Sequence, residues 1–398
     1  MSTVAAVPAT LKVAERINRI EPSATMAVVA EADKLRQSGV DVIDMSVGEP
    51  HFSTPQHIKD AAIAAINGNF TRYTAVGGTV ELKDAILQRH GKDFGSRYKR
   101  EETMASVGGK HVLFNAIQVL VDHGDEVILP VPYWVSFKDI VRYAGGNCVL
   151  LQSDEAAGFR VTAEMVARLV TPRTKLIILN SPSNPSGAVV SPEDMTEVVR
   201  FAAERGIWVI SDECYVYLNY TGREFSVGSL NDYRDRMVVV GSLSKTYAMT
   251  GWRMGYGVMR ADLATHMSRL MTNSNSCTAT FTQRAGIEAI KGDQSEPERF
   301  NEEFKKRRDV FVKGLNQIKG FSCRLPHGAF YTFPNIKQTG WPSKKLADAL
   351  LEQAGVAALS GTAFGGYGEG YLRFSIANSM ENLNLALDRV DQWTKKNL

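Results

Sequence analysis

The stretch SLSKTYAMTGWRMGY, residues 242–256, is flanked by apolar runs at Met237–Val240 and Met254–Val258. Apolar runs of about four to eight residues are typical of buried strands, so this polar stretch is expected to link two strands of a sheet. Lys245 stands among small hydroxyl residues, and Arg253 follows eight positions later after a Gly-Trp pair. Burial and neighbouring positive charge lower the pKa of a lysine, so this setting marks Lys245 as a candidate reactive amine.

The composition is that of an ordinary globular protein. The chain has 398 residues, 44% hydrophobic and 22% charged, with a formal net charge of +3. So small a charge argues against nucleic-acid binding and against a polybasic membrane anchor. No apolar run approaches the roughly 18 residues of a membrane span, and no basic cluster of a signal peptide opens the chain. The cysteines lack metal-ligand spacing, which favours buried thiols in a cytoplasmic protein without a metal site: Cys148, Cys214, Cys277 and Cys323.

Apolar runs alternate with helical patterns over most of the chain. The runs expected to be strands are 42–47, 103–107, 126–131, 147–151, 176–179, 208–211, 237–240 and 254–258. Helices are expected from Ser23 to about Gly39, over Ile58–Ile66 and over His111–Asp122. A further helix follows Ser191, with Pro192 in its first turn. This alternation favours a largely parallel sheet covered by helices.

The pattern changes after about Gly292. A long charged helical segment, Glu296–Gln317, is followed by a few isolated strands. We therefore expect a second, α+β domain that the N-terminal segment completes. The expected division is 1–53 for an N-terminal arm and part of the small domain, 54–292 for the large domain and 293–398 for the small domain.

Polar residues follow four of the expected strands. They are Gly108-Gly109-Lys110, the stretch 180–187 with Asn184, the stretch 211–215 with Asp212 and Tyr215, and the stretch 241–245 with Lys245. Ligands of open α/β sheets bind beyond the carboxyl ends of the strands, so these residues are expected to meet at one edge. Together they offer a backbone anion site, an amide, a carboxylate with a phenol, and a lysine. A phosphate-bearing aromatic aldehyde would need such a set.

Each of these residues also has a purely structural explanation. Two glycines before a helix form a tight turn as often as they form an anion site. Asn184, which precedes a proline, is a common turn residue. Asp212 could cap a helix, Trp134 could belong to the core, and most lysines are solvated surface residues. Convergence of all of them on one sheet edge favours a functional site.

Six motifs carry a resemblance to a known family. They are VGEPHFSTP at 47–55, TRYT at 71–74, VPYWVS at 131–136, NSPSNPSG at 180–187, SLSKTYAMTGWR at 242–253 and YLRFS at 371–375. With them the chain resembles the fold-type I, pyridoxal-phosphate-dependent aminotransferases of class I, particularly the bacterial aspartate aminotransferase subgroup. The resemblance implies an α/β large domain with a mostly parallel seven-stranded sheet covered by helices, a smaller α+β domain, and a homodimer with active sites at the subunit interface.

The resemblance also implies the roles of the site residues. Lys245 would bind pyridoxal 5′-phosphate covalently and move a proton of the substrate, and Asp212 would keep the cofactor's ring nitrogen protonated. Lys245, Asp212 and Tyr215 would be the catalytic residues. Asn184 and Tyr215 would bind the ring oxygen, and Trp134 would stack on the ring. The phosphate ligands would be Gly109, Lys110, Ser242, Ser244, Arg253 and, from the other subunit, Tyr73.

Substrate binding is expected to depend on Arg373. The alternation in Tyr371–Ile376 places three apolar side chains on one face of a strand and Arg373 on the other. An ion pair on an edge strand would otherwise be the simplest explanation, but the resemblance makes Arg373 the bidentate ligand of the substrate α-carboxylate. Gly48 would let that carboxylate approach the backbone, Lys110 would hold a distal carboxylate, and the other substrate contacts would be Trp134 and Asn184.

The predicted reaction is ping-pong transamination between an L-amino acid of the aspartate type and a 2-oxo acid, 2-oxoglutarate. An aminotransferase for neutral or aromatic amino acids and a β-lyase are the alternatives, because both would share every cofactor residue. A cofactor-sensing regulator would be expected to carry a further DNA-binding domain. Glu21 stands where prephenate-accepting relatives carry a lysine; it either points to solvent or repels a second substrate carboxylate by about 1 kcal/mol.

Overall fold

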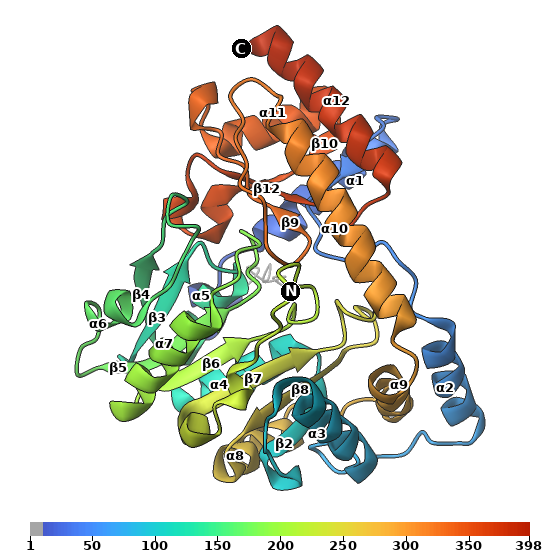
Figure 1. Ribbon diagram of the computed structural model, residues 1–398, viewed down its shortest axis with the longest axis vertical. Coiled ribbons are helices and arrows are strands. Elements are labelled where there is room, and N and C mark those ends of the chain that lie inside the picture. The colour runs from blue at the N-terminus through green and yellow to red at the C-terminus, as the bar shows by residue number, and fades with distance from the viewer. Residues whose placement is uncertain (1–10) are drawn as a thin grey trace, which may run out of the picture.

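Seven strands form the central sheet of the computed structural model, which describes residues 11–398 (Figure 1). Across the sheet they are β2 (Thr103–Val107), β8 (Met254–Met259), β7 (Met237–Ser242), β6 (Trp208–Asp212), β5 (Thr174–Asn180), β3 (Glu126–Val131) and β4 (Asn147–Gln152). Strand β8 runs in the opposite direction to the other six strands, which are parallel to one another. The predicted mostly parallel, seven-stranded sheet is confirmed.

Helices cover both faces of this sheet because alternate side chains of the strands point to opposite sides. In β5, Leu176 and Ile178 join one hydrophobic cluster, whereas Ile177 and Leu179 join another. The first cluster lies under α4 (Gly109–Leu120), α5 (Ser136–Ala144) and α8 (Ala261–Thr272). The second lies under α2 (Gln56–Asn67), α3 (Val80–Phe94), α6 (Ala163–Ala167), α7 (Pro192–Glu204) and α9 (Thr280–Lys291).

The second lobe combines both ends of the described chain. Its strands are β1 (Ile43–Asp44), β9 (Tyr331–Thr332), β10 (Val356–Ala357), β11 (Leu359–Ser360) and β12 (Leu372–Ser375). Its helices are α1 (Ala24–Gln37), α10 (Ser295–Leu315), α11 (Ser343–Ala354) and α12 (Met380–Asn397). The pair β1 and β10 is parallel, and the buried Ile43 and Met45 pack in the same cluster as α10 and α12. The N-terminal segment therefore shares a hydrophobic core with the C-terminal quarter.

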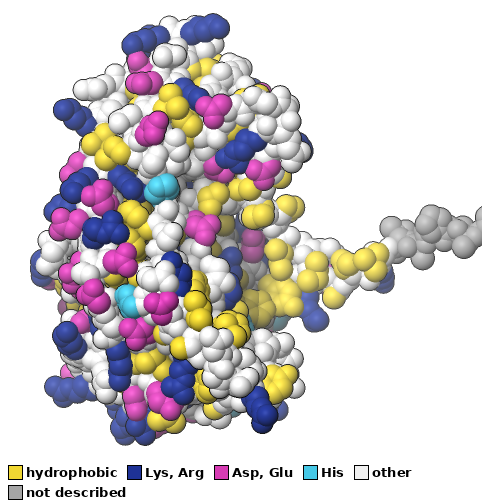
Figure 2. Space-filling model, turned by 90° about the vertical axis from the view of Figure 1, so that its right-hand side faces the viewer, with side chains coloured by type: hydrophobic (Ala, Val, Ile, Leu, Met, Phe, Trp, Pro, Cys, Tyr) yellow, Lys and Arg dark blue, Asp and Glu magenta, His cyan; other side chains and the backbone are white. Residues whose placement is uncertain are grey.

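Short 3-10 helices complete the described elements. They are η1 (Glu15–Arg19), η2 (Arg100–Glu102), η3 (Val227–Ser229), η4 (Asn231–Arg236), η5 (Lys337–Thr339), η6 (Gly361–Phe364) and η7 (Gly366–Gly368). From Leu11 to the C-terminus, no helix is both long and apolar enough to cross a membrane. Figure 2 shows the described residues nearest the N-terminus standing out from the body, with several hydrophobic side chains on them.

The helix starts predicted at Ser23 and Ser191 are confirmed. The Ser23 hydroxyl accepts a hydrogen bond from the Met26 N–H at 3.3 Å at the start of α1, and Ser191 caps α7 in the same way at 3.1 Å. In both cases a serine oxygen satisfies a backbone N–H that the helix itself leaves free. Local capping chemistry therefore decides where these helices begin.

Two local expectations were wrong. Strand β1 covers two residues instead of the predicted 42–47, because the Ser46 N–H donates to the Asp44 side chain and leaves the ladder. All four cysteines are free thiols, but only Cys323 is buried. Strand β12 is the middle strand of its sheet and is buried on both faces, which rules out the alternative of an edge-strand ion pair for Arg373.

Candidate active site

A cavity of about 280 Å³ lies beyond the carboxyl ends of β5, β6 and β7. Residues of both lobes line it, since Gly48, Tyr331 and Arg373 face it together with the strand ends of the large sheet. Every predicted site residue except Tyr73 lines this cavity. The structure therefore brings together side chains that are far apart in the sequence.

One end of the cavity is built from hydrogen-bond donors. Helix α4 begins at Gly109, and Gly108 before it has a φ of 78°, a conformation that favours glycine. A Cβ atom on Gly108 would lie 2.5 Å from Arg253 Nη2, so the arginine reaches directly behind the helix start. Ser242 and Ser244 line the same wall. Free N–H groups, the helix dipole and a guanidinium together favour an anion there.

Asp212 is the only carboxylate among the residues that line the cavity. It ends strand β6 and is 6% exposed, and its Oδ1 accepts a hydrogen bond from the Cys214 N–H at 3.2 Å. Burial raises the pKa of Asp212 to about 6, because a charged carboxylate is poorly solvated there. A cationic ligand group beside Asp212 would offset this unfavourable burial of charge.

Lys245 follows β7 and points toward the segment that enters from the small lobe. Its Nζ donates a hydrogen bond to the Gly48 carbonyl at 2.6 Å. Desolvation lowers the pKa of Lys245, and the positive charges of Arg253 and Arg373 lower it further. An amine that loses its proton more easily is a better nucleophile and a usable base at neutral pH.

The Arg373 guanidinium is buried without a carboxylate partner. Within the described residues it forms no ion pair; Nη1 donates to Asn184 Oδ1 at 3.1 Å, Nη2 donates to the Ser46 carbonyl, and Nε has no partner. Its Cζ lies 4.6 Å from the Tyr331 ring centroid. Burial lowers the pKa of Arg373, whose side chain is 3% exposed. A ligand carboxylate at Arg373 would supply the charge that this site lacks.

Gly48 and Lys110 both line the cavity. A Cβ atom on Gly48 would lie 2.1 Å from Tyr331 Oη, so this position has no room for a side chain. Lys110 Nζ lies 4.7 Å from the Trp134 ring centroid, within range of a cation–π contact. Desolvation and then Arg253 lower the pKa of Lys110. Lys110 also lines a second, larger cavity of about 790 Å³ next to the first.

Two expected residues lie apart from this arrangement. Tyr73 is 87% exposed and lines none of this cavity within the single chain. Glu21 lines the larger neighbouring cavity, and its carboxylate is bound by Lys138 Nζ at 2.7 Å and Arg142 Nη1 at 3.0 Å. These contacts lower the pKa of Glu21, and the hydrogen bond from Lys138 has the largest effect. The charge of Glu21 is therefore paired with two cations within the chain.

Two residues that sequence reasoning did not single out complete the site. Tyr331 Oη lies 2.9 Å from Tyr215 Oη, and the Tyr331 ring packs against the Arg373 guanidinium. In the sequence, the only signal for Tyr331 was its place in an isolated strand. Asn180 Nδ2 donates to the Asp212 carbonyl at 3.0 Å, and Asn180 Oδ1 accepts from the Asn184 N–H at 2.8 Å. Because Asn180 directly follows a predicted strand, the sequence could have indicated it as a site residue.

Comparison with known proteins settles the family. The sequence model for aminotransferase class I and II matches residues 40–390. The chain belongs to this family. This aminotransferase is 38% identical over 389 residues to the aspartate aminotransferase of Bacillus sp. strain YM-2, which covers 96% of this chain and 99% of that protein. It is 39% identical over 395 residues to the aspartate/prephenate aminotransferase of Nitrosomonas europaea, at 96% and 99% coverage.

Its fold also matches solved aminotransferase structures. The aspartate aminotransferase from Thermus thermophilus with maleate superimposes with a TM-score of 0.92 at 37% identity, over 96% of this chain and all of that chain. The resemblance inferred from the sequence motifs is confirmed, and the aminotransferase is dependent on pyridoxal phosphate.

The residues of the cavity fit this cofactor. A phosphate suits the end formed by the α4 N-terminus and Arg253, and a protonated ring nitrogen suits the buried Asp212. Lys245 supplies the amine that an aldehyde requires. The donor set is that of a molecule with an anionic end and a cationic ring.

Proposed function

We propose that this aminotransferase transfers the amino group of L-aspartate to 2-oxoglutarate in two half-reactions. The observation that carries the proposal is that Arg373 and Lys110, two of the cations that line the cavity with Lys245 and Arg253, form no ion pair within residues 11–398. Arg373 is buried beside Asn184, and Lys110 lines the same cavity beside Trp134. Two such cations suit a substrate with two carboxylates. Relatives named aspartate aminotransferases, and the Thermus enzyme with the dicarboxylate maleate, support this substrate class.

The residue roles that we propose follow from the contacts of each side chain. Bound in this cavity, pyridoxal phosphate supplies an aldehyde that condenses with amines and a ring that withdraws electrons from the substrate. Lys245 would hold the cofactor through its amine and would take the proton from the substrate Cα. Asp212 would keep the ring nitrogen protonated, and Tyr215 and Asn184 would bind the ring oxygen. Trp134 would pack against the ring.

Anion binding is divided between two groups of residues. We assign the cofactor phosphate to the donors at the start of α4, which are Gly109, Lys110, Ser242, Ser244, Arg253 and Tyr73 of the partner subunit. We assign the substrate α-carboxylate to Arg373, approached past Gly48, and the distal carboxylate to Lys110. For Lys110 we assign the main chain to the phosphate and the amine to the substrate.

The assembly that we propose is a homodimer with active sites at the subunit interface. Exposed apolar side chains support it, since Tyr73 is 87% exposed and the segment before α1 carries the exposed residues Leu11, Val13, Ile17 and Ile20 (Figure 2). Covering such a surface with a second copy removes apolar area from water. The four free cysteines support a cytoplasmic location. The two hydrophobic clusters on the large sheet lie wholly between Ile58 and Ile290, which supports domain limits near residues 53 and 292.

The test incubates the holoenzyme with L-aspartate and 2-oxoglutarate. We expect one glutamate for each aspartate consumed, no ammonia, and no turnover by the Lys245→Ala variant. Ammonia release without glutamate would refute transamination. A neutral or aromatic donor preferred by more than about tenfold in kcat/KM, or about 1.4 kcal/mol, would refute aspartate as the donor while leaving transamination intact.

A further inference from the structure

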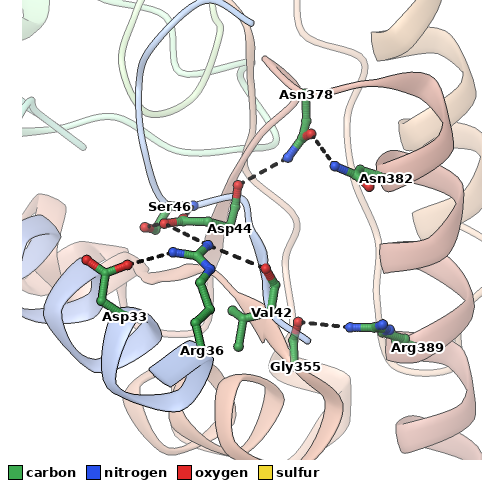
Figure 3. Close-up of polar contacts among 9 residues, drawn as sticks. All are labelled: Asp33, Arg36, Val42, Asp44, Ser46, Gly355, Asn378, Asn382 and Arg389. Carbon is green, nitrogen blue, oxygen red and sulfur yellow. Dashed lines mark hydrogen bonds and ion pairs between the residues drawn. The ribbon is translucent and has the colours of Figure 1, made fainter. Parts of the chain in front are cut away.

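A chain of polar contacts links Asp33 and Arg36 on α1 to Asp44 and Ser46 (Figure 3). Asp44 Oδ1 accepts two hydrogen bonds from Ser46, one from its N–H at 2.8 Å and one from its hydroxyl at 2.7 Å. The second Asp44 oxygen lies 3.8 Å from Arg36 Nη2, and Arg36 Nη1 donates to Asp33 at 2.8 Å. Ser46 itself is fully buried. Asp44 therefore fixes the orientation of a buried serine.

That serine holds Arg373. The Ser46 carbonyl accepts a hydrogen bond from Arg373 Nη2 and is one of only two acceptors that the described part of the chain offers this guanidinium. The residue before Ser46 is held on both sides, because the Met45 N–H donates to the Ala357 carbonyl at 3.0 Å and the Met45 carbonyl accepts from the Ser375 N–H at 2.7 Å. The backbone orientation at Ser46 therefore depends on the two hydrogen bonds from Ser46 to the Asp44 side chain, which take the place of β-ladder hydrogen bonds there.

The same segment reaches the catalytic lysine two residues later. The Gly48 carbonyl accepts a hydrogen bond from Lys245 Nζ at 2.6 Å. The Asn378 side chain steadies the start of the segment, since its Nδ2 donates to the Asp44 carbonyl at 3.2 Å and its Oδ1 accepts from Asn382 Nδ2 at 2.8 Å (Figure 3). The segment that this network holds therefore presents two carbonyl groups, those of Ser46 and Gly48, to the cations Arg373 and Lys245.

We propose that Asp44 is a positioning residue for the α-carboxylate site: by fixing Ser46, it aims the carbonyl that holds Arg373 and so sets the affinity for both substrates. The inference rests on the role of Arg373 in the proposed function. Every amino acid and every 2-oxo acid of the reaction carries an α-carboxylate, so both half-reactions depend on the same orientation. Arg373 contacts that carboxylate before and during the chemical step, and a change in uniform binding of this kind alters KM more than kcat.

The test compares four holoenzyme variants. In Asp44→Ala both bonds to Ser46 are lost, and we expect KM for aspartate and for 2-oxoglutarate to rise by about tenfold each, with kcat within about threefold of wild type. In Asp44→Asn the amide oxygen accepts the same two bonds, so both KM values should stay within about threefold. Ser46→Ala loses only the hydroxyl bond and should lie between these two variants.

Asp41→Ala is the matched control. Asp41 also ties the region of β1 to α12, through an ion pair with Arg389, but it makes no hydrogen bond to Ser46. Both KM values should therefore remain those of wild type. If Asp41→Ala raises them as much as Asp44→Ala does, the effect is a general loosening of the lobe and the positioning role is overturned.

Calorimetric binding of maleate, which does not react, supplies a readout independent of turnover. Its dissociation constant should rise by about tenfold in Asp44→Ala and stay near wild type in Asp44→Asn, with Arg373→Lys as a variant known in advance to remove the guanidinium. Unchanged maleate binding in both Asp44→Ala and Ser46→Ala, alongside weakened binding in Arg373→Lys, would overturn the proposal. Should Asp44→Ala fail to fold, Ser46→Ala decides by the same criterion. If wild type prefers another donor, only the aspartate assignment fails, because the α-carboxylate test applies to that donor equally.

Discussion

Asp212 is expected to destabilise the cofactor-free protein while it supports the holoenzyme. Within residues 11–398, no lysine or arginine forms an ion pair with Asp212, whose carboxyl group is buried at the end of β6. Burial raises its pKa from 3.8 to about 6. Substitution by asparagine keeps the shape and an oxygen that can accept from the Cys214 N–H, but it removes the charge.

The size and sign of the effect follow from the two pKa values. A difference of about two units corresponds to ~3 kcal/mol, since each unit is worth about 1.4 kcal/mol. The folded-state pKa is raised, so the folded apoprotein binds more protons than the unfolded chain between about pH 4 and pH 6. The stability that goes with the protonated carboxyl is therefore complete below about pH 4 and is lost as the pH rises through about 6. Asp212→Asn never ionises and escapes this loss.

The assay is urea unfolding of the apoprotein from pH 4 to pH 8 at one fixed protein concentration. Wild type and Asp212→Asn should be equally stable near pH 4, and the variant should be up to ~3 kcal/mol more stable above pH 6. Burial also raises the pKa of Glu213, to about 7, but Glu213 is present in both proteins and largely cancels in the difference. The holoenzyme should show the opposite effect, with turnover reduced on the order of a hundredfold or more. A difference in apoprotein stability that does not change with pH would refute the reasoning.

Two further substitutions test the walls of the cavity. Lys110→Ala should raise KM for aspartate and 2-oxoglutarate by about tenfold, through loss of one charge-assisted contact, and leave KM for a neutral donor unchanged in steady-state assays; an equal rise for the neutral donor would contradict a distal-carboxylate role. Gly48→Ala places a Cβ atom 2.1 Å from Tyr331 Oη, so it should destabilise the protein by about 1–3 kcal/mol in urea unfolding. Adding Tyr331→Phe removes that oxygen and should restore part of the loss; a double variant no better than the single one would place the strain elsewhere.

The large sheet and one wall of the site could be predicted from the sequence because their signals are local. Each buried strand carries a continuous apolar run that ends in a polar residue. Because the strands are parallel, these polar residues lie together at the edge of the sheet where ligands bind. Asp212 and Lys245 were found in this way, and Asn180 could have been. The family resemblance supplied Arg373, whose own strand was interpreted from alternation alone.

The remaining contacts depend on segments that meet only in the folded chain. Tyr331 pairs with Tyr215, and Glu21 pairs with Lys138 and Arg142, over separations that no periodicity encodes. The end of β1 was mispredicted for a different reason, because the Asp44 side chain competes with the backbone ladder for the Ser46 N–H. A short polar side chain thus overrode an apolar pattern that otherwise favoured a longer strand.

The electrostatic relation between Arg373 and Lys245 connects substrate binding to catalysis. The Arg373 charge is one of the causes that lower the pKa of Lys245, after desolvation. A substrate carboxylate at Arg373 cancels that charge and so raises the pKa of the lysine, which makes Lys245 a stronger base when it must remove the substrate Cα proton. The segment from Ser46 to Gly48 contacts both cations through backbone carbonyls, whose positions do not depend on protonation. Because this backbone segment is fixed, binding at Arg373 affects Lys245 through its charge and not through a movement of the segment. The size of this effect on the Lys245 pKa then depends on how firmly Asp44 holds Ser46.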